Sequence, residues 1–341
     1  MMIFLCILII IVLILVILVI LEIVMLFLVR HPRVLRFFSH KLQNSISYLY
    51  VQSERKIMQF QEGCGQYHPE LGYTLKPGRF IFSGEEFSNS YFINSLGVRD
   101  REEALIRPEI VIVGDSFALG WGVEQDETFA KLLEQKTKLK TLNTSVPSYG
   151  TVREMIMLRR VDISNLKCLI IQYCGDDYDE NLKFYLNDNR PQIMRAETFA
   201  NLTKQHSQIK KYYMGKYLLM KIKKRIKEWK SLPPEKLDQM QLSDVDLFIH
   251  VLKQNENMLR SLPIIIFEIN GINQTNFFST TLKQKLCNVS NPPFIQALNV
   301  LDMSQHLSDE DFYVLDDHLT VTGNTKVADV LYRKMKGMNI I

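Results

Sequence analysis

The chain has 341 residues, of which 47% are hydrophobic and 23% charged, with 15 glycines, 11 prolines and 5 cysteines. This composition excludes collagen-like, disordered and disulfide-scaffold proteins. The net charge of +4, from 41 basic and 37 acidic residues, is too small to indicate nucleic-acid binding by itself.

The chain begins with a long apolar run. From Met1 to Val29 the one charged side chain is Glu22, and Arg30 ends the run. A bilayer core about 30 Å thick needs about 20 apolar helical residues, so the sequence predicts a transmembrane anchor over residues 1–30, with residues 2–29 in the bilayer. A cleaved signal peptide is the alternative. Signal peptides usually have a cation before an apolar region of about 7–15 residues, whereas this run has none and is about twice as long.

The cations after the anchor bear on its orientation. After the apolar run no acidic residue appears until Glu54, and the positive-inside rule therefore favours a cytoplasmic location for the rest of the chain; the cations concerned are Arg30, Arg33, Arg36 and Lys41. The cysteines do not decide the compartment, because they show neither a CxxC pair nor zinc-ligand spacing.

Residues 31–60 have the pattern of a partly helical juxtamembrane stalk, and residues 61–108 that of turns and short strands leading into a domain that extends to residue 341. Beyond residue 108, short apolar runs alternate with amphipathic stretches, which predicts an α/β fold with a doubly wound parallel sheet. The expected strands are Glu109–Val113, Leu139–Asn143, Cys168–Tyr173, Ile264–Ile269 and Asn299–Leu301. The expected helices are Thr128–Lys136, Thr151–Val161, Val245–Leu262 and Thr322–Met338.

A helical insertion of about residues 185–244 interrupts this alternation. Its segment Lys210–Lys230 has nine basic residues and one acidic residue. The helical spacing predicts one apolar stripe, formed by Leu218, Ile222, Ile226 and Trp229. Three interpretations stay open: a cap helix with a solvated basic face, a helix lying on anionic headgroups, and a nucleic-acid contact, although no reading motif supports the last.

Two short motifs have the residues of a hydrolytic site. The first predicted strand leads directly into Gly114-Asp115-Ser116, which places a serine hydroxyl at the carboxyl edge of the sheet, where α/β proteins hold nucleophiles. Near the end of the chain, Asp316-Asp317-His318 precedes the last predicted helix. A nucleophilic serine needs an imidazole base and a carboxylate that fixes its tautomer, and this chain order suits that geometry.

Taken together, these motifs resemble the SGNH (GDSL) hydrolases, specifically the membrane-anchored bacterial members. The second block of that family resembles Leu142–Thr151, and the third block falls at Gly175-Asp176-Asp177. The lead-in Asn94–Asp100 is also similar, and the resemblance covers about residues 66–338. It implies a flavodoxin-like, doubly wound parallel sheet.

The resemblance assigns roles residue by residue. Ser116 would be the nucleophile, His318 the base and Asp316 the acid that orients it. The oxyanion hole would comprise the Ser116 N–H, a second-block N–H and the third-block side chain. The second-block glycine of the family is replaced by Ser148, with Gly150 two residues later, and the third-block asparagine is replaced by Asp176.

The aspartate at position 176 is the more serious departure. An ionised carboxylate only accepts hydrogen bonds and would repel an oxyanion. Losing one such donor typically lowers the rate about 100- to 1000-fold, unless the carboxylic acid is held in its protonated form.

The sequence therefore predicts a membrane-tethered serine esterase or O-acyltransferase that acts through an acyl-serine. The alternative is a catalytically silent domain that binds a glycan or a partner protein. The tether and the family favour an acylated glycan or lipid as substrate and an extracytoplasmic location, against the charge rule. No cofactor, metal ion or nucleic acid is implied: the glycines after Ser116 do not match a dinucleotide fingerprint, and the acidic residues 176–180 have no EF-hand pattern.

Overall fold

The computed structural model describes residues 2–208, 212–230, 242–272 and 274–341, and it omits the side chains of residues 227–230. The contacts divide the chain into two compact units, each described by itself. The helical unit comprises residues 1–55, 208–241 and 314–316, and the α/β unit comprises residues 56–207, 242–313 and 317–341.

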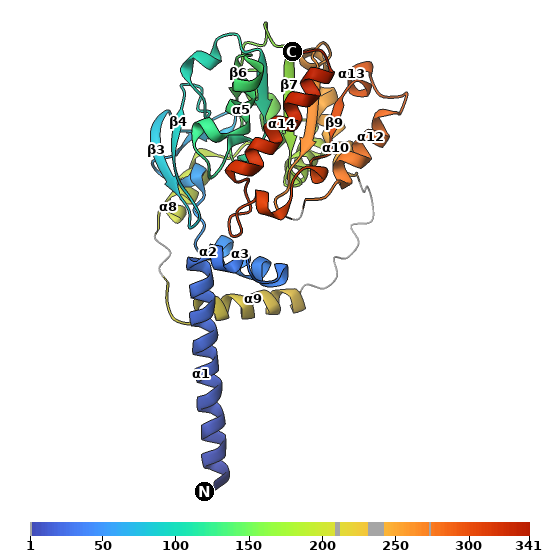
Figure 1. Ribbon diagram of the computed structural model, residues 1–341. Helices are drawn as coiled ribbons and strands as arrows, with labels where there is room; N and C mark the ends of the chain where they lie inside the picture. Colours follow the sequence, from blue (N-terminus) through green and yellow to red (C-terminus); the bar gives the residue numbers. More distant parts are fainter. Residues whose placement is uncertain (1, 209–211, 231–241, 273) are drawn as a thin grey trace. The chain divides into compact units, whose positions relative to one another are not determined.

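The helical unit contains α1 (Met2–Arg30), α2 (Pro32–Leu35), α3 (His40–Ser53) and α9 (Lys216–Lys230). Helix α1 is long and apolar enough to cross a membrane, with a mean hydropathy of 4.1, and its side chains from Met2 to Leu21 are all exposed. Its last turns instead join a small apolar core with α2, α3 and the start of α9. Figure 1 shows α9 running crosswise to α1, with α3 beside it.

The α/β unit is built on a five-stranded parallel sheet. Its strands are β5 (Ile110–Val113), β6 (Thr141–Asn143), β7 (Cys168–Tyr173), β8 (Ile264–Glu268) and β9 (Asn299–Leu301), in the spatial order β6-β5-β7-β8-β9. Counted within the sheet this is the order 2-1-3-4-5 of flavodoxin-like proteins. In such a sheet the crevice at the carboxyl ends lies where the order reverses, between β5 and β7.

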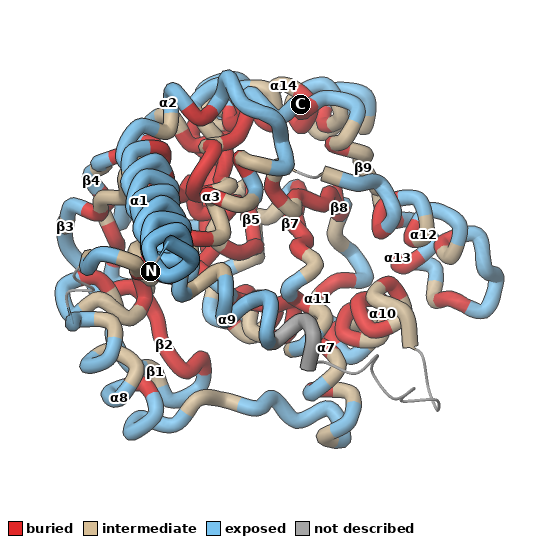
Figure 2. The backbone as a smooth tube through the Cα atoms, turned by 90° about the horizontal axis from the view of Figure 1, so that it is seen from below, coloured by how far each residue is buried: buried red, intermediate tan, exposed pale blue. Residues whose placement is uncertain are grey.

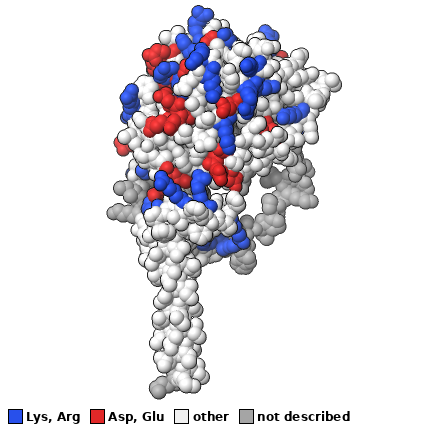
Figure 3. All heavy atoms as spheres, viewed as in Figure 1, with Lys and Arg blue, Asp and Glu red and all other residues white. Residues whose placement is uncertain are grey.

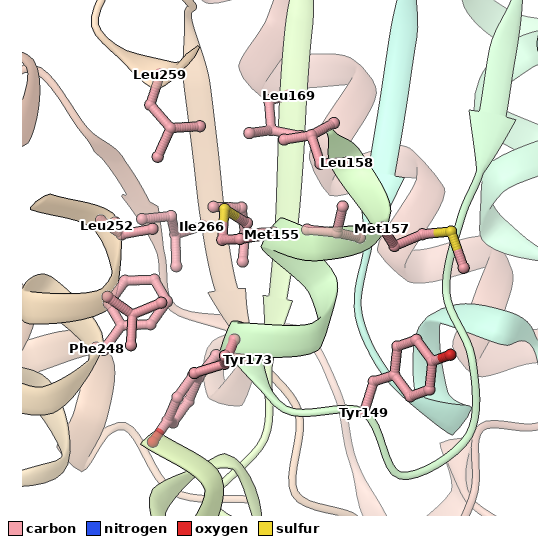
Figure 4. Packing of buried hydrophobic residues seen from close by; sticks show 14 of the residues in the cluster. Tyr149, Met155, Met157, Leu158, Leu169, Tyr173, Phe248, Leu252, Leu259 and Ile266 are labelled. Carbon is pink, nitrogen blue, oxygen red and sulfur yellow. The ribbon is translucent and has the colours of Figure 1, made fainter. Parts of the chain in front are cut away.

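Alternate residues of each strand pack on opposite faces of the sheet, as the two-residue period of a strand requires. Val111, Leu169 and Ile266 face one cluster of helices, whereas Ile112 and Ile170 face the other. The first cluster is contributed by α6 (Thr151–Leu158), α10 (Asp244–Gln254) and α12 (Phe277–Leu286), and the second by α4 (Ser116–Leu119), α5 (Phe129–Thr137) and α14 (Val321–Gly337). Figure 2 shows the central strands as buried, and Figure 4 shows the side chains of the first cluster, among them Met155 and Phe248.

Two antiparallel hairpins precede the sheet, within the segment predicted to contain turns and short strands. They pair β1 (Gly65–His68) with β2 (Gly72–Leu75) and β3 (Gly78–Ser83) with β4 (Ser88–Ile93). Aromatic side chains of the second hairpin pack against the loop that follows β5: Phe82 contacts Trp121 edge-on, with ring centroids 4.8 Å apart.

The remaining elements are short. They are α7 (Asp177–Leu186), α8 (Ala196–Ser207), α11 (Glu256–Leu259), α13 (Pro293–Gln296) and the 3₁₀ helices Met58–Phe60, Glu102–Leu105, Gln125–Glu127, Met303–Gln305 and Asp309–Asp311. The predicted parallel α/β sheet is confirmed, and each predicted strand lies within two residues of its observed bounds. The helix expected over Val245–Leu262 is interrupted at Asn255, which leaves helical geometry and caps the preceding turn through its side chain.

Candidate active site

Ser116 lies at the carboxyl end of β5, the position expected for a nucleophile in this fold. It is the first residue of the short helix α4, and it is half-buried. Asp115 caps this helix by accepting a hydrogen bond from the Phe117 N–H at 2.8 Å. From the neighbouring strand, Gln172 accepts one from the Asp115 N–H at 3.1 Å. The turn that carries the serine is therefore fixed from both sides.

His318 approaches Ser116 from a loop 202 residues further along the chain. Its Nε2 lies 2.7 Å from Ser116 Oγ, which is hydrogen-bonding distance, and the imidazole is 3% exposed. The ring stacks on Trp121 with centroids 5.1 Å apart and contacts Phe117 on another side. An isolated bridge between Phe312 and Leu319 closes the base of the loop. The imidazole is thus held by packing as well as by the hydrogen bond.

The two aspartates before His318 have different surroundings. The Asp317 carboxylate accepts a hydrogen bond from the Ile272 N–H, after β8. Asp316 is 1% exposed and falls in the helical unit, where Tyr50 Oη donates to its Oδ2 at 3.3 Å and Arg55 Nε lies 3.5 Å from its Oδ1. The two carboxylates of this loop are therefore engaged by different parts of the chain.

The second block contains two backbone N–H groups, those of Ser148 and Gly150, which are predicted from the sequence to form part of the oxyanion hole. Ser148 has a φ of +59°, in the left-handed region that glycine adopts without strain. Among the described residues, no acceptor is hydrogen-bonded to the Ser148 N–H. The Gly150 N–H, in contrast, donates to Glu180 Oε2 at 3.2 Å. Of the two, Ser148 is the N–H that remains available.

Asp176 is the N-cap residue of α7 and follows β7, the strand next to the one that leads to Ser116. Its side chain is exposed. The loop before it is fixed by Asn270, whose Oδ1 accepts from the Gly175 N–H at 2.7 Å. The carboxylate therefore lies at the same sheet edge as the serine, in the place where the resembling family has an amide.

Three further carboxyl groups are buried close to this edge: Asp115, Glu154 and Asp177 are 6%, 2% and 2% exposed. Thr151 donates a hydrogen bond to Asp177 at 2.8 Å, whereas neither oxygen of Glu154 has a partner among the described residues. Burial raises the pKa of all three groups, and their mutual repulsion adds to the effect. For Asp115 the pKa rises to about 7, with Asp176 contributing through its charge.

The lead-in segment Asn94–Asp100 stabilises the loops around this site. Arg99 is 1% exposed, lies 3.9 Å over the Tyr91 ring, and donates to carbonyl oxygens of the loop after Ser116. The adjacent Asp100 pairs with Lys131 at 2.7 Å and accepts from the Asn143 N–H at 3.0 Å. Two consecutive residues thereby tie the loops that follow β5 and β6.

Several supporting residues were not identified from the sequence. Arg153 stacks on Tyr149 at 4.6 Å, pairs with Glu180 at 2.7 Å and donates to the Ser148 carbonyl, so it fixes the second block. Gln172, which accepts a hydrogen bond from the Asp115 N–H, is a second supporting residue that was not identified. The signal that could have found it is a polar side chain within a predicted buried strand. Within the described part of the chain, no group of three or more His, Cys, Asp or Glu residues could hold a metal ion.

No protein-family model matches the chain, and no curated protein matches it. Among solved structures it is similar to a protein from Desulfitobacterium hafniense DCB-2 that is provisionally assigned to the G-D-S-L family of lipolytic proteins. The similarity covers 66% of this chain and 97% of that chain, at 12% sequence identity and a TM-score of 0.37.

Proposed function

We propose that this protein is a serine esterase or O-acyltransferase of the SGNH type, tethered to a membrane by α1. The observation that carries the proposal is the 2.7 Å contact between Ser116 Oγ and His318 Nε2 at the carboxyl edge of a flavodoxin-like sheet. A serine paired with a buried imidazole is the arrangement that activates a hydroxyl for attack on an ester. The motifs that resemble the SGNH hydrolases lie at the ends of β5, β6 and β7 and before α14, as such a site requires.

In the proposed reaction, Ser116 Oγ attacks the ester carbonyl while its proton passes to His318 Nε2. The tetrahedral intermediate then collapses, the carbon–oxygen bond to the alcohol breaks, and His318 returns the proton to the leaving alkoxide. A second hydroxyl, from water or a sugar, attacks the acyl-Ser116 and gives its proton to His318. The bond between the acyl carbon and Ser116 Oγ then breaks, and His318 returns the proton to Ser116. Asp316 would hold the imidazole in the tautomer that presents a bare Nε2 to the serine.

Two N–H groups support the developing oxyanion in this scheme, those of Ser116 and Ser148. Asp176 replaces the side-chain donor, so we expect a slow enzyme. Asp176→Asn supplies that amide and should raise kcat about 100-fold, the typical contribution of one oxyanion donor. Hydrolysis of p-nitrophenyl acetate measures this. An unchanged or lower rate would show that position 176 is not a missing donor, and Asp179→Asn, in the first turn of α7, is the matched control.

The serine is tested directly by labelling the detergent-solubilised full chain with a fluorophosphonate probe. We expect labelling of the parent protein and its loss in Ser116→Ala and in His318→Ala, because removing either group typically lowers reactivity by about 10⁴-fold or more. Exposed counterparts, Ser290→Ala and His306→Ala, should label normally. A folded parent protein that does not label would contradict the proposal and favour the silent, ligand-binding domain.

The tether and its sidedness belong to the same proposal. A retained α1 would keep the catalytic unit at the envelope, where acylated glycans and lipids are the substrates within reach, and we propose an extracytoplasmic location. The four cations after α1 favour the opposite side by the positive-inside rule. C-terminal fusions to alkaline phosphatase and to green fluorescent protein distinguish the two. Phosphatase activity supports our assignment, and fluorescence without phosphatase activity overturns it.

A further inference from the structure

Glu22, the one charged side chain within the apolar part of α1, is completely buried inside the helical unit. It accepts hydrogen bonds from the first turn of α9: the Tyr217 N–H donates to Oε1 at 3.0 Å and the Leu218 N–H to Oε2 at 2.9 Å. The Tyr212 hydroxyl also donates to Oε1, at 3.1 Å. A carboxylate at a helix N-terminus satisfies N–H groups that have no partner within the helix and interacts favourably with the helix dipole. Glu22 therefore fixes the start of α9 to α1.

The position of Glu22 along α1 sets the level of this attachment. The exposed stretch from Met2 to Leu21 is about 30 Å long at the helical rise of 1.5 Å per residue, which equals the thickness of a bilayer core. Glu22 follows this stretch directly, and residues beyond it, such as Met25 and Leu28, are buried within the helical unit. If Met2–Leu21 crosses the core, α9 begins at the level where the core ends.

Helix α9 leaves this point crosswise to α1, as Figures 1 and 2 both show. One face packs into the helical unit: Tyr217 is completely buried, Met220 is partly buried in the same cluster, and Lys224 Nζ lies 4.0 Å over the Tyr48 ring of α3. A helix that crosses a membrane-spanning helix in this way runs parallel to the bilayer surface.

The opposite face of α9 is apolar and exposed. Leu219, Ile222 and Ile226 are 46%, 54% and 45% exposed and, at spacings of three and four residues, form one stripe. This corrects the stripe predicted from sequence: Leu218 is half-buried in the core of the helical unit, and the Trp229 side chain lies outside the described residues. Aligned large apolar side chains on a surface mark an interaction site more often than a solvated face.

Cations flank this stripe on both sides. On the helical wheel Lys223 lies beside it on one side and Arg225 on the other, and the described side chains of α9 include no carboxylate. Figure 3 shows Lys and Arg side chains gathered here. Burial together with the positive charges of Arg225 and Lys224 lowers the pKa of Lys221, so the cluster is electrostatically crowded. An apolar stripe between cations is the pattern of helices that lie in the interface of anionic membranes.

We propose that α9 is an interfacial helix that rests on the anionic surface of the bilayer crossed by α1. Leu219, Ile222 and Ile226 enter the boundary between headgroups and acyl chains, while Lys223 and Arg225 reach the phosphates alongside. This inference rests on the proposed anchor. Figure 1 shows α3 on one side of α9 and the length of α1 extending away on the other. Because Lys224 packs toward Tyr48 of α3, the opposite, exposed face of α9 is turned away from α3.

The test places an environment-sensitive dye on the full chain. Cys6→Ala and Cys287→Ser remove the exposed thiols, and the other cysteines are buried. Single cysteines are then introduced by Ile222→Cys in the stripe, by Lys224→Cys on the packed face as the matched control, and by Ile11→Cys as a reporter of the anchor. The labelled proteins are reconstituted in vesicles of phosphatidylcholine with phosphatidylglycerol, with and without lipids that carry a spin label on the acyl chain.

We expect quenching by the spin-labelled lipid at positions 11 and 222 and little at 224. Quenching at 11 with aqueous fluorescence at 222 overturns the interfacial helix and leaves the anchor standing. Absence of quenching at 11 means instead that the anchor itself has failed. Ile226→Cys repeats the measurement within the stripe, so that misfolding of one variant does not decide the outcome.

The choice of an anionic surface is tested separately. Lys223→Gln and Arg225→Gln should each lower the partition constant of the stripe into the membrane by about fivefold, because each removes one cation. Vesicles of phosphatidylcholine alone should have the same effect on the parent protein. Equal quenching at position 222 in neutral and anionic vesicles would show that the cations of α9 do not contribute to its membrane binding. If 222 remains aqueous in both, the stripe is a surface for another macromolecule and the proposal fails.

Discussion

Glu22 in the helical unit and Glu154 in the α/β unit are both almost entirely buried, at 0% and 2% exposure, yet their surroundings differ. Glu22 accepts three hydrogen bonds, two of them from a helix N-terminus. Glu154 has none among the described residues, and burial raises its pKa well above the usual range, with Asp177 and Asp115 adding repulsion. One buried carboxyl group organises its unit through the hydrogen bonds that it accepts, whereas the surroundings of the other disfavour its ionised form.

Asp115 is intermediate between these two. It accepts one hydrogen bond from the Phe117 N–H, and its pKa is raised to about 7. The hydrogen bonding of these acids differs: Glu22 accepts three bonds, whereas Glu154 accepts none among the described residues. Replacing the acid by a neutral residue should therefore lower the stability at Glu22 and raise it at Glu154.

The largest effect is expected from Glu22→Ala. It leaves the N–H groups of Tyr217 and Leu218 without their acceptor at a buried site, which costs about 3 kcal/mol. Local opening of α9 should then become roughly 100-fold more frequent, and hydrogen exchange of those two amides in the detergent-solubilised protein measures this. Glu62→Ala, an exposed residue of the α/β unit, is the control. Unchanged protection would mean that α9 is held by apolar packing alone.

Glu154→Gln is expected to raise the free energy of unfolding, by about 2 kcal/mol at alkaline pH. The folded-state pKa of Glu154 lies above its ordinary value of 4.5, so its contribution to stability is complete below about pH 4.5 and is lost as the pH rises through the folded pKa. The variant cannot ionise and should keep its Tm when the pH is raised. Thermal unfolding at acidic and alkaline pH checks this against the exposed Glu197→Gln; a Tm that falls in parallel with the parent protein contradicts it.

Asp115→Asn should change the stability mainly near neutral pH, because asparagine keeps the helix-capping oxygen and removes only the titration. The folded pKa of about 7 is above the ordinary 3.8, so the parent protein loses this contribution as the pH rises from about 4 to 7. The variant should lose less stability over that window. A stability profile identical to that of the parent protein would mean that Asp115 is ionised throughout.

The sheet could be predicted from the sequence because each strand is a short run bounded by turn residues, and β5, β6, β7 and β8 are buried along their whole length. Ser116 and His318 could be singled out because motifs at both ends of the domain required each other. Their contact at 2.7 Å is a product of the whole fold.

The features that could not be predicted from the sequence depend on neighbours in the folded structure. Nothing local distinguishes Leu218 from Leu219, and only the packing of α9 on α1 decides which is exposed. The Gly150 N–H is taken by Glu180, a residue 30 positions away on another helix. Helix α7 was not expected, because its first turn has three acidic side chains and little apolar periodicity, although acids favour a helix N-terminus.

The burial of Arg99 has a consequence for how the molecule is made. A guanidinium can leave water only when its acceptors are already in place, and here they are the Ser90, Leu119, Gly120 and Val123 carbonyls, contributed by β4 and by the loop after Ser116. The hairpin and the loop after Ser116 must therefore become ordered together for Arg99 to be buried with its acceptors in place. A chain whose β3–β4 hairpin is displaced would also lose the order of the loop that carries Ser116.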